Sequence, residues 1–322
     1  MGTTLARTAL RMPSIRIMGA CDKVEAQAKT LATEAKCDYY TEINDLLSKH
    51  DFDAVIVATP NYTHRDLTIV SLEAGKHVFC EKPMALTLED CDAMIDTARR
   101  NGLTLMIGHV MRYWPGNASA KQAIANGEIG KPIHCQAVRT YWAKPGTRSK
   151  SWRQSKDLCG NGLFEVMIHD IDLMRWFTGD VESVQAYGAN FAHPEYDYED
   201  CFTAILKFKD GALGTLVFGN SFRSGDWRIK VNGTTGSVLA DFAASPMIIK
   251  IASEGGPEHT EPLLAGSEAD LCIPELQHFV KCILDGTGPL TDGWEGRSAV
   301  EIATAITQSA ESGGPVKFPL RG

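Results

Sequence analysis

The stretch AVIVATPNYTHRDLTIVSLEAGKHVFCEKP, residues 54–83, decides the fold class of this chain. An apolar run at 54–58 is followed by a polar break, a helical pattern at 63–74 and a second apolar run at 77–80. Two buried strands joined by a helix predict a parallel βαβ unit. Lys82 then lies just past the second strand, at the edge of an open α/β sheet where ligands bind. A lysine there could also be a solvated loop charge, but the flanking Glu81 and Pro83 favour a site.

The same alternation extends over residues 1–108 and predicts a Rossmann-type, doubly wound parallel sheet. Further strands are expected at 15–20, 37–40 and 104–107, and further helices at 3–12, 23–35, 42–49 and 88–100.

After Gly108 the pattern changes to longer alternating strands separated by hairpin signals such as Asn232-Gly233. This predicts that residues 109–322 form an α+β domain with a large, mainly antiparallel sheet. Strands are expected at 133–142, 181–189, 201–208, 212–220, 226–231 and 237–241, and helices at 117–126, 165–177, 274–284 and 297–311.

The amino terminus departs from a complete dinucleotide-binding domain. Such a domain begins with a strand and a G-x-G-x-x-G turn, whereas this chain passes from Met1 directly into a helix and retains only Gly2. In the strand order 3-2-1-4 the missing first strand is central, so we expect Met1 to be an internal methionine of a longer protein. Gly160-Asn161-Gly162 lacks a preceding strand and is better interpreted as a flexible substrate loop.

Asp22 stands where an acidic residue accepts hydrogen bonds from the ribose of the cofactor. Its charge would repel a 2′-phosphate and therefore favours NAD, although the adjoining Lys23 leaves NADP open.

The composition limits the partners and the compartment. The chain has 322 residues, of which 44% are hydrophobic and 22% charged, as in ordinary soluble proteins of about two domains. A net charge of -8 argues against binding to nucleic acid, and no apolar run approaches the length of about 18 residues that spans a membrane. The nine cysteines show no CxxC spacing, so we expect reduced thiols, no metal site and a cytoplasmic protein.

The first 21 residues contain Arg7, Arg11 and Arg16 and no acid. A mitochondrial presequence has this composition, but a first helix leading into a strand explains the same residues and is preferred.

A second candidate group lies in the run GLFEVMIHDIDLMRWFTG, residues 162–179. Glu165, His169 and Asp172 are four and three residues apart, so one side of a helix would present acid, imidazole and acid. A solvated face or a satisfied core histidine is about as good an interpretation of this group alone.

Taken together, these segments resemble the glucose-fructose oxidoreductase, inositol dehydrogenase and MocA family of NAD(P)-dependent oxidoreductases. The resemblance covers nearly the whole chain, and it implies that residues 109–322 serve substrate binding and oligomerisation. It is carried by Ala58-Thr-Pro-Asn-Tyr-Thr-His64, Gly75-Lys-His-Val-Phe-Cys-Glu-Lys-Pro83, Gly108-His-Val-Met-Arg-Tyr-Trp-Pro115, Trp152-Arg153 and His169-Asp-Ile-Asp172.

The resemblance implies that Lys82 lies between nicotinamide and substrate, that His169 is the acid/base residue, and that the carboxylate of Glu165 assists it. The family commonly has Asp where this chain has Glu165. The charge is the same but the side chain is longer by one methylene, so the difference bears on the substrate's position more than on the chemistry. The remaining implied residues border the cofactor (Thr59, Pro60, Asn61, His64 and Glu81, the last also holding Lys82) or the substrate (Arg112, Trp152, Arg153 and Asp172).

The expected activity is hydride transfer between NAD(P) and a secondary alcohol of a sugar or cyclitol, in a dimer or tetramer. A neutral imidazole suits removal of the hydroxyl proton, and a lysine ammonium suits stabilisation of the alkoxide. Two alternatives are an NAD-dependent glycosidase of the same fold and a non-catalytic nucleotide-binding sensor. Trp142, Trp152 and Trp176 offer a sugar-stacking surface, although core packing explains each as well.

Overall fold

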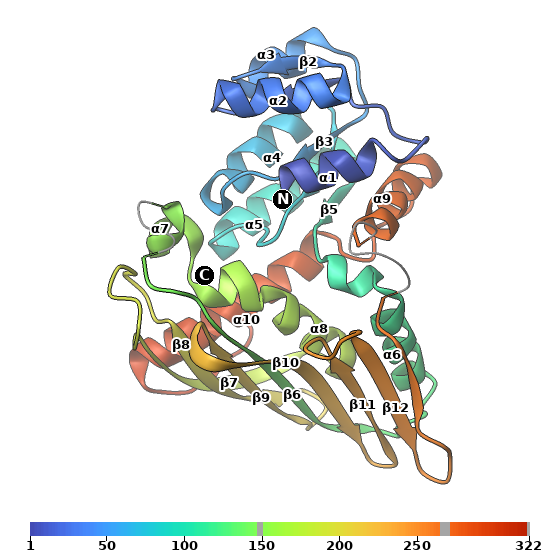
Figure 1. Cartoon of the computed structure of the whole chain (residues 1–322), viewed down its shortest axis with the longest axis vertical. Coiled ribbons are helices and arrows are strands. Elements are labelled where there is room, and N and C mark those ends of the chain that lie inside the picture. Colours follow the sequence, from blue (N-terminus) through green and yellow to red (C-terminus); the bar gives the residue numbers. More distant parts are fainter. Residues whose placement is uncertain (147–150, 265–270, 321–322) are drawn as a thin grey trace.

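The computed structural model describes residues 1–146, 151–264 and 271–320. Figure 1 shows an elongated molecule, with short parallel strands toward one end and one broad sheet toward the other. Helices α8 (Ile168–Thr178) and α10 (Gly293–Ser312) lie between the two.

The first part follows the predicted alternation of strands and helices. Its strands are β1 (Gly19–Cys21), β2 (Asp38–Tyr40), β3 (Ala54–Val57), β4 (His77–Cys80) and β5 (Leu105–Ile107), and its helices are α1 (Gly2–Ala9), α2 (Glu25–Ala35), α3 (Ile43–Lys49), α4 (His64–Glu73) and α5 (Leu88–Asn101). Local signals set the ends of α5, because the Thr87 hydroxyl accepts from the Asp90 amide and Gly102 adopts the left-handed conformation. The prediction of a Rossmann-like parallel sheet is confirmed.

The parallel strands form two separate sheets. β1 pairs only with β2, whereas β3, β4 and β5 form a second sheet in that order. β1 and β3 are the two strands that the order 3-2-1-4 would place on either side of a first strand. The strand expected at 15–20 is shortened to Gly19–Cys21, since residues 15–18 have no neighbouring strand to pair with.

The second part is built on one nine-stranded sheet, which confirms the predicted large, mainly antiparallel sheet. Its strand order is β13-β12-β11-β10-β6-β9-β8-β7-β14, and all neighbours are antiparallel except β6 and β9. The strands are β6 (Pro132–Trp142), β7 (Val181–Ala189), β8 (Cys201–Phe208), β9 (Leu213–Gly219), β10 (Ser221–Gly233), β11 (Gly236–Asp241), β12 (Ile248–Ser253), β13 (His259–Pro262) and β14 (Val316–Lys317). The sequence did not predict β12, β13 and β14.

The helices of the second part lie near their predicted positions, except for α7 (Lys156–Cys159), which the sequence did not predict. They are α6 (Pro115–Ala125), α7, α8, α9 (Ile273–Asp285) and α10, with 3-10 turns η1 (Asn61–Thr63), η2 (Val110–Tyr113) and η3 (Trp152–Gln154). The helix expected at 165–177 differs at its start, because Leu163–Met167 (η4) is a π-helix that continues into α8.

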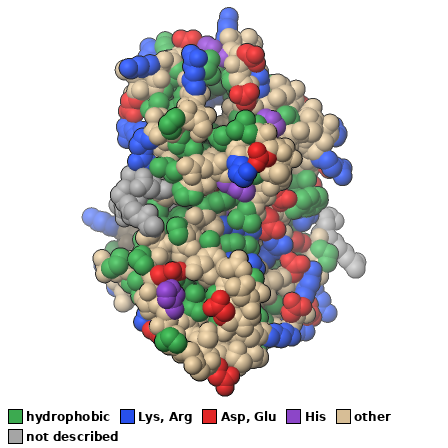
Figure 2. Space-filling model, turned by 90° about the vertical axis from the view of Figure 1, so that its right-hand side faces the viewer, with side chains coloured by type: hydrophobic (Ala, Val, Ile, Leu, Met, Phe, Trp, Pro, Cys, Tyr) green, Lys and Arg blue, Asp and Glu red, His purple; other side chains and the backbone are tan. Residues whose placement is uncertain are grey.

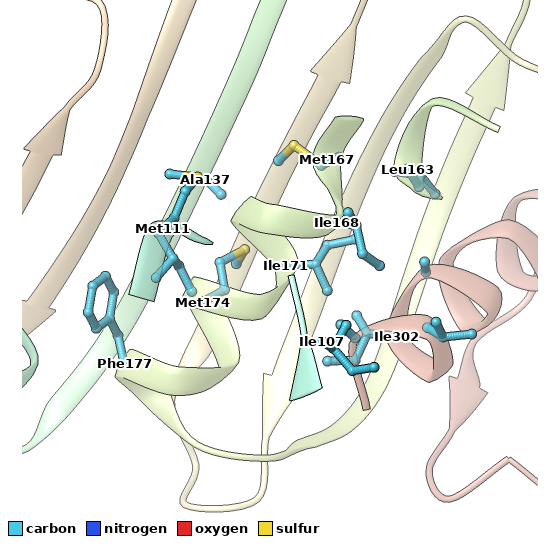
Figure 3. Packing of buried hydrophobic residues seen from close by; sticks show 14 of the residues in the cluster. Ile107, Met111, Ala137, Leu163, Met167, Ile168, Ile171, Met174, Phe177 and Ile302 are labelled. Atoms are coloured by element: carbon cyan, nitrogen blue, oxygen red, sulfur yellow. The ribbon is translucent and has the colours of Figure 1, made fainter. Parts of the chain in front are cut away.

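Helix α8 is buried on several sides. Figure 3 shows Ile168, Ile171 and Met174 of α8 packed near Ile107 of β5 and Ile302 of α10. Burying each such side chain contributes about 1.5–3 kcal/mol. The backbone that carries His169 is therefore held firmly between the sheet and α10.

The carboxyl-terminal helices return to the first part of the molecule. Phe279 of α9 packs edge-on against Phe79 of β4, with 5.8 Å between ring centroids. Ahead of α10, the Thr291 carbonyl accepts from the Ile107 amide at 2.8 Å. These contacts join the end of the chain to the sheet that carries Lys82.

Figure 2 shows acidic and basic side chains scattered over one side of the molecule. Within the described ranges, no helix is long and apolar enough to cross a membrane.

Candidate active site

The loops that follow β3 and β4 lie at the same sheet edge and are tied together by His64. Its Nδ1 lies 2.7 Å from the Pro83 carbonyl, and its Nε2 lies 3.0 Å from the Thr59 carbonyl. Burial lowers the pKa of His64, and the two carbonyl groups oppose that shift, because only the protonated ring donates to both of them. In this structure His64 braces the loop containing Thr59 and Pro60 against the loop containing Lys82.

Lys82 reaches from this edge to the second part of the molecule. Its Nζ donates to the backbone carbonyl of Glu165 at 2.8 Å, which leaves two ammonium N–H groups for a ligand. Burial lowers the pKa of Lys82, and the charges of Glu165 and Glu81 oppose that shift. The expected role of Glu81 in holding Lys82 takes a different form, because its carboxylate accepts from the Lys82 backbone amide at 3.2 Å.

The π-helix Leu163–Met167 contains the main-chain oxygen that binds Lys82. A π-turn interrupts the regular i to i+4 hydrogen bonding, and such turns often occur at functional sites. The Glu165 carbonyl accepts from Lys82, and the next carbonyl, of Val166, accepts from Arg139 Nη1 at 3.2 Å. Two cations are thereby held by consecutive carbonyl groups.

The Glu165 carboxylate links both parts of the molecule. It accepts from Arg153 Nε at 2.5 Å and from Asn61 Nδ2 at 3.1 Å. Asn61 also donates to the Cys159 carbonyl at 3.0 Å. The Arg153 guanidinium lies 4.1 Å from the centroid of the Trp152 ring. Four residues from three predicted groups therefore meet here: Asn61, Trp152, Arg153 and Glu165.

His169 lies one turn further along, with a partly accessible side chain. Burial lowers its pKa well below the usual value, and the nearby charges of Lys82 and Arg139 act in the same direction. The ring is therefore neutral near pH 7 and is able to accept a proton. Its Nδ1 is buried and has no hydrogen-bond partner among the described residues.

Arg112 and Asp172, both predicted to border the substrate, bind each other. Each is only 2% exposed, and the guanidinium donates to both carboxylate oxygens, at 2.8 and 2.6 Å. Arg112 also donates to Glu295 of α10 at 2.6 Å. The structure therefore places this pair behind the site, and its contact with substrate stays a prediction.

Two residues near the site were not assigned from the sequence. His109 lies against His169, and it stands in a motif that was recognised without giving this position a role. Arg139 lies in β6, whose sequence PIHCQAVRTYW contains other polar residues as well, so the strand pattern did not single it out.

Comparison with known proteins identifies the family. Residues 1–109 match the model described as oxidoreductase family, NAD-binding Rossmann fold, and residues 117–239 match the GFO/IDH/MocA C-terminal domain. The chain belongs to the GFO/IDH/MocA oxidoreductases. The resemblance inferred from its motifs is confirmed, and the family description supports the predicted cofactor, NAD.

Individual relatives of this GFO/IDH/MocA chain are named for different activities. The 2,7-anhydro-N-acetylneuraminate hydratase of Mediterraneibacter gnavus is 34% identical over 80% of this chain and 68% of the relative. The myo-inositol 2-dehydrogenase of Thermotoga maritima is 31% identical over 87% of this chain and 84% of the relative. The crystal structure of an aldose-aldose oxidoreductase from Caulobacter crescentus has a TM-score of 0.84 at 29% identity, covering 94% and 92% of the two chains.

The residues of this GFO/IDH/MocA protein at the sheet edge fit a dinucleotide. Asp22 directly follows β1; one of its oxygens accepts from the Val24 amide at 2.8 Å, and the other has no partner among the described residues. Gly2 begins α1 and lies beside this edge, since a Cβ added there would be in van der Waals contact with the Ala58 carbonyl oxygen at 3.4 Å. Lys23 is paired with Glu42 at 2.6 Å in this structure.

Proposed function

We propose that this GFO/IDH/MocA protein oxidises a secondary alcohol of a small sugar or cyclitol with NAD. The observation that carries this proposal is the approach of Lys82 to the helix of His169, where its ammonium binds the Glu165 carbonyl. A cation that stabilises an alkoxide and a neutral base that removes its proton thus come from opposite parts of the molecule. The relative named myo-inositol 2-dehydrogenase supports the substrate class.

In this proposal each side chain of the site has a separate role. When bound, NAD supplies the hydride acceptor. His169 takes the hydroxyl proton on its accessible ring nitrogen, and the two free N–H groups of Lys82 donate to the same oxygen. Asn61 and Arg153 hold the Glu165 carboxylate, and Asp22 is the residue suited to accept hydrogen bonds from a ribose diol.

The test is a comparison of Lys82→Met and His169→Asn with exposed control variants, Lys131→Met and His259→Asn. NADH formation is followed with myo-inositol and a panel of aldoses, and NAD affinity is measured separately by calorimetry. We expect a loss of turnover of about 100-fold or more in the two site variants, with NAD affinity changed far less. Unchanged turnover in both site variants contradicts the assigned roles.

A second candidate is a reaction that uses NAD only transiently, favoured by the 34% identity to a protein named as a hydratase. Such an enzyme converts its substrate without net NADH formation, as an NAD-dependent glycosidase also would. Incubation with NAD and 2,7-anhydro-N-acetylneuraminate, followed by mass spectrometry, separates these cases. Product without NADH supports this candidate, whereas NAD binding without turnover of any substrate supports a sensor.

We also propose that the protein forms a homo-oligomer through the open face of the nine-stranded sheet. Tyr187 of β7 and Ile205 of β8 are 68% and 61% exposed on adjacent strands. Sedimentation velocity measures the assembly; a monomer at micromolar concentration would contradict it.

A further inference from the structure

His109 occupies a buried position directly behind His169. It follows β5, is 1% exposed, and meets the His169 ring edge-on with 6.2 Å between centroids and an interplanar angle of 84°. On its other side, His109 Nδ1 lies 3.9 Å from Asp172 Oδ2. The three side chains form a row from the carboxylate to the imidazole of the site.

Three of the four ring nitrogens in this row are buried and lack partners among the described residues. Neither ring nitrogen of His109 has a partner among the described residues, and neither does His169 Nδ1. A buried polar group without a partner costs about 1–3 kcal/mol. The distance of 3.9 Å between His109 Nδ1 and Asp172 Oδ2 would fall within the range of a hydrogen bond if the His109 ring moved by about 1 Å toward the carboxylate. The two imidazoles, with 6.2 Å between centroids, and the Asp172 carboxylate are thus close enough for small ring movements to join them.

The surroundings fix the direction of such a chain of hydrogen bonds. Arg112 holds both oxygens of Asp172, so the carboxylate is an immobile anchor. Burial lowers the pKa of His109, and a neutral ring has one donor and one acceptor. Because a carboxylate only accepts, the donor must be the nitrogen facing Asp172, and the other nitrogen becomes an acceptor.

We propose that His109 is a positioning residue that donates from Nδ1 to Asp172 and accepts the Nδ1 proton of His169 on Nε2. This arrangement selects the His169 tautomer whose Nε2 is unprotonated, and thus rests on the proposed role of His169 as the base. When His169 takes a proton from substrate, its Nδ1–H still donates to His109. The charged groups that face His109 are Asp172 of α8, Arg112 of η2, Lys82 after β4 and Glu295 of α10.

The first test reads tautomers in the intact protein and needs no substrate. Histidines labelled with 15N are observed by long-range 15N–1H correlation NMR with NAD added. The proposal expects a proton on Nδ1 of both His109 and His169. A proton on Nε2 of His109 in the wild type overturns it, whether or not the protein is a dehydrogenase.

The second test compares two replacements of His109. His109→Phe retains a ring without hydrogen-bonding groups, and His109→Gln restores an acceptor. We expect the Phe variant to mix the His169 tautomers and to lower kcat about tenfold or more, with the KM for NAD unchanged and activity partly rescued by Gln. An unchanged tautomer and unchanged pH profile of kcat/KM in both variants overturn the proposal. A fixed tautomer in a protein that oxidises no alcohol would instead contradict the proposed function alone.

Discussion

His169 and Lys82 illustrate at the residue scale how burial sets chemistry. Burial lowers the pKa of both groups, but their active forms differ in charge. His169 acts neutral, so activity is lost as the pH falls through its pKa. Lys82 acts charged, so activity is lost as the pH rises through its pKa.

We therefore predict a bell-shaped dependence of kcat/KM on pH, with both limbs displaced toward acid. The acid limb should have an apparent pKa below 6.5 and the alkaline limb one below 10.5, the ordinary values of the two groups. The profile is measured with the best substrate of the panel between pH 5 and 10. An acid limb at or above 6.5 would contradict the neutral state of His169.

At the scale of the element, α9 contains a carboxyl group, that of Glu275, whose burial destabilises the fold when the group is ionised. Glu275 is 1% exposed, and neither carboxylate oxygen has a partner among the described residues. Burial raises its pKa well above the ordinary value, and the neighbouring Glu81 adds to the shift. A carboxyl group of this kind stabilises the fold only while it is protonated.

We predict that Glu275→Gln flattens the dependence of stability on pH. Since the folded pKa is the higher one, wild-type stability is fully present below the unfolded pKa and is lost as the pH rises through the folded pKa. At pH 8 the variant should be more stable by about 1 kcal/mol or more, given about 1.4 kcal/mol for each pKa unit. Urea unfolding at pH 5, 6.5 and 8 measures this, with the exposed Glu258→Gln as control; equal slopes would refute it.

Most elements were predictable from the sequence, because the apolar period separates strands from helices. The exceptions have physical causes. The π-turn at Leu163–Met167 has the same residue types as an α-helix, and β13 (His259–Pro262) consists of polar residues that pair only because β12 lies beside them. Motifs brought Lys82, Asn61 and Glu165 to attention, but not the pairing of Arg112 with Asp172, which depends on tertiary distance.

At the scale of the whole molecule, the β1–β2 sheet has fewer stabilising contacts with its neighbours than the β3–β5 sheet has. The β1–β2 sheet has no strand pairing with β3–β5 among the described residues. The Arg7–Glu34 ion pair joins α2, which follows β1, to α1, and it lies at the surface, where such pairs contribute about 1 kcal/mol or less. In contrast, β4 is paired on both sides and packs on α4 and α9.

We predict that the segment from β1 to α3 opens locally before the rest of the molecule. Native-state hydrogen exchange should give amides of Ala20, Cys21 and Tyr40 a lower free energy of opening than those of Val78 and Phe79. NAD should slow exchange near Asp22 if that residue binds it. Equal protection of β1 and β4 in the free protein would show that the two sheets unfold as one unit.

The π-turn has a consequence for how this site can be altered. The oxygens that receive Lys82 and Arg139 belong to the main chain of Glu165 and Val166, and every amino acid carries the same oxygen. Side-chain scanning at these two positions would therefore leave both contacts formally intact and would underestimate their importance. Removing one residue from Leu163–Met167, by contrast, would change the course of the main chain that carries both oxygens, and so would disturb both contacts at once.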